Sequence, residues 1–224
     1  MRSHISSARW LFLALLPALL PLSVRLSAAQ EEVFQKNGDA WPVVPLSPAR
    51  SDDAYAIYSY LVPGEFPNAG IENKPLWLIA NPTVVVSEEM MSPRKGIAAP
   101  QNQQQAMASV LADYDQHKYE HAILERNFHL ALPYLLLDRA AQARYIQLKE
   151  ASDAQHDPSV LAPFQNAQGL VYFSNVYFNF EHTLAIVYVV RWCGAQCGDM
   201  NWVALKKING DWSRLDWTAD VGHF

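Results

Sequence analysis

The stretch that most constrains the fold is Val171–Trp217, which combines strand-like runs, a strong turn signal and both cysteines of the chain. Thr183–Arg191 is β-branched and aromatic, too short for a typical helix, and apolar on both of its alternating faces. This pattern indicates a central strand covered on both sides. Val171–Phe178 is similar, although its polar residues predict one partly wet face. The short polar link Asn179–His182 is typical of a hairpin.

Asn209-Gly210 separates two further strand-like runs, 201–208 and 211–217. This dipeptide is a strong hairpin signal, because both central residues of a type I′ turn need a positive φ. A two-residue loop places Ile208 opposite Asp211, Lys207 opposite Trp212, Ala204 opposite Leu215 and Trp202 opposite Trp217. The Lys207 ammonium is then positioned to lie on the Trp212 indole. The sequence therefore predicts a four-strand antiparallel meander.

The two cysteines, Cys193 and Cys197, fall at the bend between the second and third predicted strands, flanked by glycines. We interpret them as a structural disulfide closing a short loop. A labile or regulatory disulfide with a redox role is one alternative. Metal binding is another, although a zinc site would need two further ligands and the chain has no other cysteine. A thioredoxin-like motif has two residues between its cysteines, whereas this pair has three.

The C-terminal motifs resemble those of a group of uncharacterised secreted bacterial proteins. The resemblance is carried by Phe173–Asn179, Ala185–Val189, Cys193-Gly194, Cys197-Gly198, Val203–Lys207 and Asn209-Gly210 with Trp212, and more loosely by segments between Ala54 and Thr83. It implies an exported protein with the same C-terminal sheet. It implies no reaction, because we know of no activity for that group.

The first 29 residues are typical of a secretory signal: Arg2 and Arg9 precede the apolar run Trp10–Val24, and small residues end at Ala29. An uncleaved anchor is the alternative, although the run is shorter than the ~20 residues that span a bilayer. Residues 30–51 contain three prolines and are interpreted as an extended lead-in. Residues 52–224 are predicted to form a single domain. The expected location is therefore secreted or periplasmic, with no stable membrane span after cleavage.

The middle of the chain predicts helices at Gln103–Tyr119 and Asp138–Glu150, with Asp138 as a possible cap. Asp52–Pro63 fits either a short helix or a strand, and Leu76–Val86 fits a strand interrupted at Asn81-Pro82. Ala122–Leu137 is ambiguous. Together these elements predict an α+β fold, an antiparallel sheet with one or two helices packed on one face.

His117, Glu120 and His121 form the pattern H-x-x-E-H. On a helix the two histidines would share a face and could bind zinc, with the glutamate as a general base. Such peptidases add a downstream glutamate, for which Glu181 is the candidate. The competing interpretation is a solvated helix end with exposed histidines, because three fixed positions arise by chance in long chains.

No motif for a serine nucleophile, a phosphate loop or a dinucleotide fold is present, and no cofactor is predicted. The formal net charge of −5 argues against a nucleic-acid partner. The sequence therefore favours a non-catalytic extracytoplasmic protein that binds an unidentified ligand or protein, or has a structural role. A zinc hydrolase using His117, Glu120 and His121 and a redox protein using Cys193 and Cys197 are the alternatives.

Overall fold

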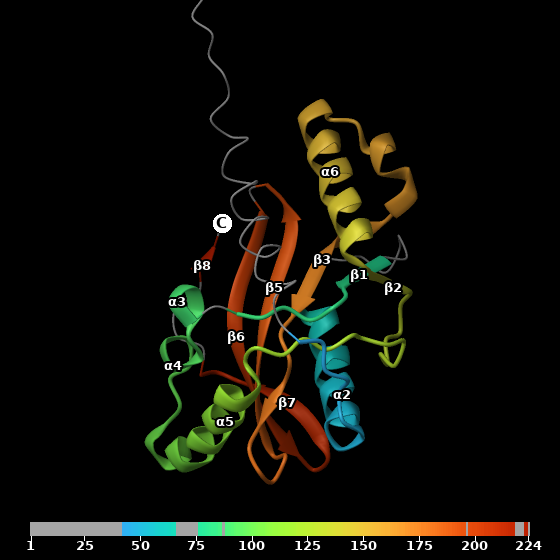
Figure 1. Cartoon of the computed structure of the whole chain (residues 1–224). Coiled ribbons are helices and arrows are strands. Elements are labelled where there is room, and N and C mark those ends of the chain that lie inside the picture. Colours follow the sequence, from blue (N-terminus) through green and yellow to red (C-terminus); the bar gives the residue numbers. More distant parts are fainter. Residues whose placement is uncertain (1–41, 66–75, 87, 196, 218–221, 224) are drawn as a thin grey trace, which may run out of the picture.

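Helices and strands are interspersed along the chain (Figure 1). The computed structural model describes residues 42–65, 76–86, 88–195, 197–217 and 222–223. In these ranges the helices are α2 (Pro48–Glu65), α3 (Glu88–Met91), α4 (Pro93–Gly96), η2 (Gln101–Gln103), α5 (Gln104–His117), α6 (Arg139–Gln155) and η3 (Pro158–Phe164). The strands are β1 (Leu76–Ala80), β2 (Tyr134–Leu137), β3 (Ala167–Phe173), β4 (Tyr177–Phe178), β5 (Leu184–Gly194), β6 (Cys197–Ile208), β7 (Asp211–Leu215) and β8 (Gly222–His223). This content confirms the predicted α+β class.

The sheet is mixed rather than wholly antiparallel. Its strands follow the order β2-β1-β3-β5-β6-β7, while β4 pairs with β5 and β8 pairs with β6. The antiparallel run β5-β6-β7 confirms the last three strands of the predicted meander. The predicted first strand, Val171–Phe178, is divided into β3 and β4, and both pair antiparallel with β5. However, β1 is parallel to both β2 and β3, so the expectation of a purely antiparallel sheet is wrong. Parallel neighbours need long crossover connections, which leave no short-range turn signal in a sequence.

The β6–β7 turn forms as the sequence predicts. Asn209 and Gly210 have φ values of 54° and 98°, the left-handed conformations that a type I′ turn requires. The ladder pairs Ile208 with Asp211, Lys207 with Trp212 and Ala204 with Leu215. The predicted pair Trp202–Trp217 lies beyond this ladder, because β7 ends at Leu215 and the Trp217 carbonyl accepts from the Ala98 N–H instead.

Helices cover both faces of the sheet, which corrects the expectation that they would pack on one face. Ala185, Val187 and Val189 of β5 pack in one core with α2. The alternate residues of the strand, which include Ile186 and Tyr188, pack in a second core with α5. α6 covers the sheet over β1, β2 and β3. A strand that is apolar on both faces must be covered twice to remove its side chains from water.

The helix starts follow local chemistry. α2 begins at Pro48, inside the predicted lead-in, because proline is favoured at a first helical position whose N–H has no partner in the helix. The expected start at Asp52 therefore lies within the helix. At α6 the predicted cap is confirmed, because the Asp138 side chain accepts from the Ala141 N–H at 2.8 Å. That helix continues to Gln155, past its predicted end.

The break between β3 and β4 consists of polar residues that are buried. The prediction of a partly solvent-exposed face here is therefore wrong. Ser174 is fully buried and Asn175 is 7% exposed. The Ser174 hydroxyl accepts from the Tyr188 N–H and donates to the Asn175 carbonyl, and the Ser174 carbonyl accepts from the Tyr58 hydroxyl. The Asn175 amide oxygen accepts from the Thr83 hydroxyl. These polar groups have partners, which is the condition for burying them at low cost.

The predicted signal segment, residues 1–29, lies outside the described residues. Within the described ranges, no helix combines the length and the apolar character needed to cross a bilayer.

The predicted disulfide is present in the structure. Cys193 and Cys197 are bonded across the β5–β6 turn, with their Cα atoms 5.1 Å apart. Gly194, between them, has a φ of 143° that favours glycine. The cysteine at position 197 is exposed, and the bond ties the ends of two long paired strands together.

We expect the double variant Cys193→Ser/Cys197→Ser to lose about 2 kcal/mol of unfolding free energy, because the unfolded chain regains the entropy of a short loop. Urea unfolding of the variant would measure the loss, and the native chain unfolded with a dithiol reductant should match it. An unchanged unfolding free energy would show that the bond does not stabilise the fold.

Candidate functional site

The H-x-x-E-H segment does not form the helical face on which the zinc interpretation depended. α5 ends at His117. His121 instead pairs with Val43 in an isolated bridge, and its N–H donates to the Pro42 carbonyl. The two histidines therefore do not occupy successive turns of one helix.

The side chains of this segment have other partners. His117 Nδ1 lies 2.9 Å from Glu120 Oε2. His121 is 3% exposed, and its Nδ1 donates to the Thr83 carbonyl at 2.7 Å. Glu181, the candidate downstream glutamate, accepts from the Asn179 side chain. Across the residues that the structure describes, no three histidine, cysteine or acidic side chains are grouped to hold a metal ion.

The outer edge of β4 is closed by an ion pair instead of a strand. Arg50 Nη2 donates to the Val176 carbonyl at 2.9 Å, and the Phe178 N–H donates to Asp113 Oδ2 at 2.8 Å. Arg50 and Asp113 join each other through two hydrogen bonds of 2.8 Å. We call this arrangement the edge clamp. It satisfies backbone groups that would otherwise be open to another strand, and it links α2 to α5.

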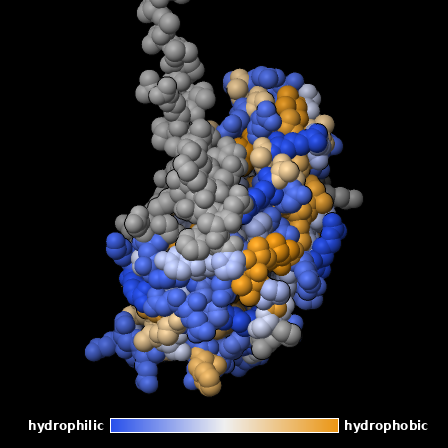
Figure 2. Space-filling model, viewed as in Figure 1, coloured by the Kyte–Doolittle hydropathy of each residue, from blue (hydrophilic) through white to orange (hydrophobic). Residues whose placement is uncertain are grey.

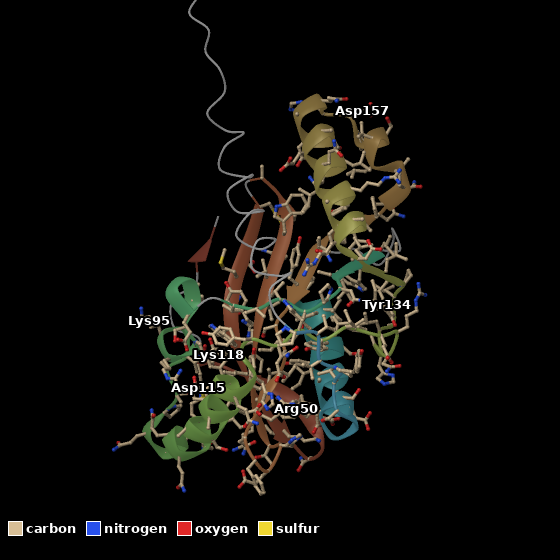
Figure 3. All side chains as sticks on the ribbon, in the orientation of Figure 1. Arg50, Lys95, Asp115, Lys118, Tyr134 and Asp157 are labelled. Atoms are coloured by element: carbon tan, nitrogen blue, oxygen red, sulfur yellow. A yellow bond between two sulfur atoms is a disulfide. The ribbon has the colours of Figure 1, made fainter. Side chains whose placement is uncertain are left out.

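The Phe178 ring is held by two charged or polar side chains. The Arg50 guanidinium lies 5.6 Å from its centroid. The His182 ring stacks on it at 4.6 Å with an interplanar angle of 3°. Figure 3 shows Arg50 between α2 and α5, at the end of the molecule opposite Asp157. The edge clamp and the β4–β5 loop are therefore one packed unit.

Asp53 joins the same unit to the β6–β7 hairpin. Its Oδ1 accepts from Lys207 at 2.6 Å and from the Trp212 indole at 3.1 Å. His182 Nδ1 lies 3.4 Å from Oδ2. Burial raises the pKa of Asp53, but the hydrogen bonds from Lys207 and Trp212 outweigh it and hold the pKa below the ordinary value. The Lys207 ammonium also lies 5.6 Å from the Trp212 ring centroid, as predicted.

The β4–β5 loop is rigidly organised by one buried side chain. Asn179 is 4% exposed, and its Oδ1 accepts from the Thr183 and Leu184 N–H groups. Its Nδ2 donates to Glu181 and to the Thr183 hydroxyl. The backbone of Phe180 is held as well, because its N–H donates to the hydroxyl of a serine in α5, Ser109.

This ordered loop presents Phe180 to solvent with 90% of its surface exposed. Figure 2 shows hydrophobic atoms projecting at the lower end of the molecule, where the β4–β5 loop lies in Figure 1. The β6–β7 turn is beside it, because the Lys207 N–H donates to the Thr183 carbonyl. We define the loop end as the exposed residues Asp52, Phe180, Glu181, Ile208 and Asp211.

The histidine rings of this region have hydrogen-bond partners within the fold. His117 and His182 lie against the carboxylates of Glu120 and Asp53, and His121 donates to the Thr83 carbonyl. The loop end itself combines an exposed aromatic ring with exposed carboxylates.

Sequence reasoning missed this surface. Asn179–His182 has the pattern of a polar hairpin link, although it contains a phenylalanine. A large apolar residue in so short a link has no strand face to occupy, and this was the signal in the sequence that could have predicted an exposed ring.

Comparison of the chain with family models, with curated proteins and with solved structures finds no match. The resemblance to secreted bacterial proteins therefore stays a prediction.

We expect Arg50→Met to lower the unfolding free energy by about 3 kcal/mol, because it leaves Asp113 facing the strand edge without its partner. Arg94→Met is the matched control: Arg94 also forms a two-point pair with an aspartate, Asp115, but both side chains are 45% exposed. The control should lose under about 1 kcal/mol. Urea unfolding measures both, and equal losses would contradict the structural role of the edge clamp.

We expect Asp53→Asn to lose about 1–3 kcal/mol at neutral pH, because three polar contacts to an ionised carboxylate weaken. The folded pKa lies below the unfolded value of 3.8, so this stabilisation is complete above that value and is lost as the pH falls through the folded pKa. Urea unfolding across the acidic range should show the native and variant curves converging. A constant difference between them would contradict the role of the charge.

Proposed function

We propose that this protein is a non-catalytic binding protein that acts outside the cytoplasm and recognises a protein partner through the loop end. The observation that carries the proposal is Phe180, a large apolar side chain exposed over 90% of its surface on an ordered loop. Burying such a ring against a partner contributes about 2–3 kcal/mol.

The order of the loop adds to this contribution. Side chains or loops that become ordered only on binding reduce the affinity. Here Asn179 and Ser109 already hold the backbone on both sides of the ring. The partner would therefore meet a ring whose backbone is fixed in place before contact.

The surroundings of Phe180 support a protein partner. Hot-spot residues of protein interfaces are large side chains surrounded by groups that exclude water. Ile208 is 50% exposed and supplies further apolar surface on the neighbouring turn. Asp52, Glu181 and Asp211 supply the polar rim.

The extracytoplasmic part of the proposal rests on two features. Residues 1–29 have the pattern of a secretory signal. The Cys193–Cys197 disulfide has an exposed cysteine, and such bonds persist in oxidising compartments.

The test is photocross-linking in the native host, with a benzophenone amino acid replacing Phe180. We expect irradiation to yield a discrete protein adduct that mass spectrometry identifies. The matched control carries the same group at Tyr119, which is 45% exposed and lies just beyond α5. The same adduct from both positions, or none from position 180, would contradict the proposal.

Phe180→Ala should abolish capture of that partner while changing the unfolding free energy by no more than about 0.5 kcal/mol, since the side chain contributes little to the core. Affinity capture with the purified adduct partner and urea unfolding separate the two effects. A large loss of stability would show that Phe180 supports the fold instead.

A further inference from the structure

We infer that the partner presents a basic surface, in which lysine and arginine side chains border an apolar depression that takes the Phe180 ring. This inference rests on the proposed function and adds the chemistry of the partner. It follows from the balance of charges around the exposed ring.

Two cations beside the loop end are already neutralised by ion pairs. Arg50 is paired with Asp113. Lys207 is paired with Asp53 at 2.6 Å. These two pairs leave no net charge for a partner to meet.

The three carboxylates of the loop end, Asp52, Glu181 and Asp211, are all exposed to solvent. The β6–β7 hairpin carries two further described cations, the half-buried Lys206 and the exposed Arg214, so the carboxylates outnumber them. These described charges therefore sum to a negative value at this end of the molecule. A like-charged partner would be repelled, whereas a basic one would be steered toward the ring.

The positions of the three carboxylates follow from contacts already described. Asp52 precedes Asp53, which binds two side chains of the β6–β7 hairpin. Glu181 follows Phe180 directly, and Asp211 pairs with Ile208 at the turn. The acidic groups thus lie on α2, on the β4–β5 loop and on β7, three elements joined by the contacts of Asp53 and by the hydrogen bond from the Lys207 N–H to the Thr183 carbonyl.

The same charges disfavour an anionic membrane as the target. An exposed phenylalanine can insert into a lipid surface, but proteins that bind anionic lipids carry basic residues beside the apolar ones. The loop end carries acidic ones, and the whole chain has a formal net charge of −5. A protein with a basic surface is therefore the occupant that the charges favour.

The test uses a phage-displayed library of random linear peptides, selected on the full chain. A neutralised variant combines Asp52→Asn, Glu181→Gln and Asp211→Asn. A control variant places three lysines on the exposed surface of α6, at the opposite end of the molecule (Figure 1), through Gln147→Lys, Ala154→Lys and Gln155→Lys. The two variants change the net charge by the same amount.

We expect the selected peptides to combine an apolar or aromatic segment with flanking lysine or arginine. Their affinity should fall about tenfold on the neutralised variant and stay unchanged on the control, and added salt should reduce this difference. Phe180→Ala should abolish their binding.

The outcomes separate the two proposals. Selected peptides that need Phe180 but carry no basic residues would overturn the basic partner and leave the proposed function standing. Peptides that bind Phe180→Ala equally well would overturn the proposed function itself. A selection without enriched peptides, or Phe180-dependent sedimentation with phosphatidylglycerol vesicles, would also overturn the basic protein partner.

Discussion

The ion pair between Arg50 and Asp113 is the interaction on which the packing around the short strand β4 depends. Two charged side chains taken partly out of water cost free energy, and only good geometry and further hydrogen bonds offset that cost. Here the pair is bidentate, and each member also binds a backbone group beside the short strand β4. The sheet edge and the two helices are consequently joined by one contact.

The C-terminal half of the fold was accessible from the sequence because its signals are local. Asn209-Gly210 sets a two-residue turn, and the apolar pattern of Thr183–Arg191 requires cover on both faces. The apolar pattern on both faces of Thr183–Arg191 already implied helices on both sides of the sheet. The expectation of helices on one face was inconsistent with that pattern. The parallel pairing of β1 with β2 was not accessible, because it joins segments separated by a long connection.

The candidate site was harder to predict than the fold, for a related reason. Arg50 and Asp113 are 63 residues apart, so no spacing rule connects them. His117 and His121 are close in sequence and drew attention, but α5 ends before the second of them and their rings bind different partners. A short motif indicates chemistry only when the backbone keeps the geometry that the motif assumes. Phe180 was visible as an apolar residue in a polar link, yet its exposure depends on how the loop folds.

The buried amide of Asn179 also makes the conformation of the loop independent of which residue stands at its tip, position 180. Because the hydrogen bonds that hold the loop join the Asn179 side chain, the Ser109 hydroxyl and backbone groups, the side chain at position 180 takes no part in them. If the proposed function holds, substitutions at that position would change which partner is bound while these hydrogen bonds stay the same. Binding specificity could then diverge at one position on an unchanged scaffold.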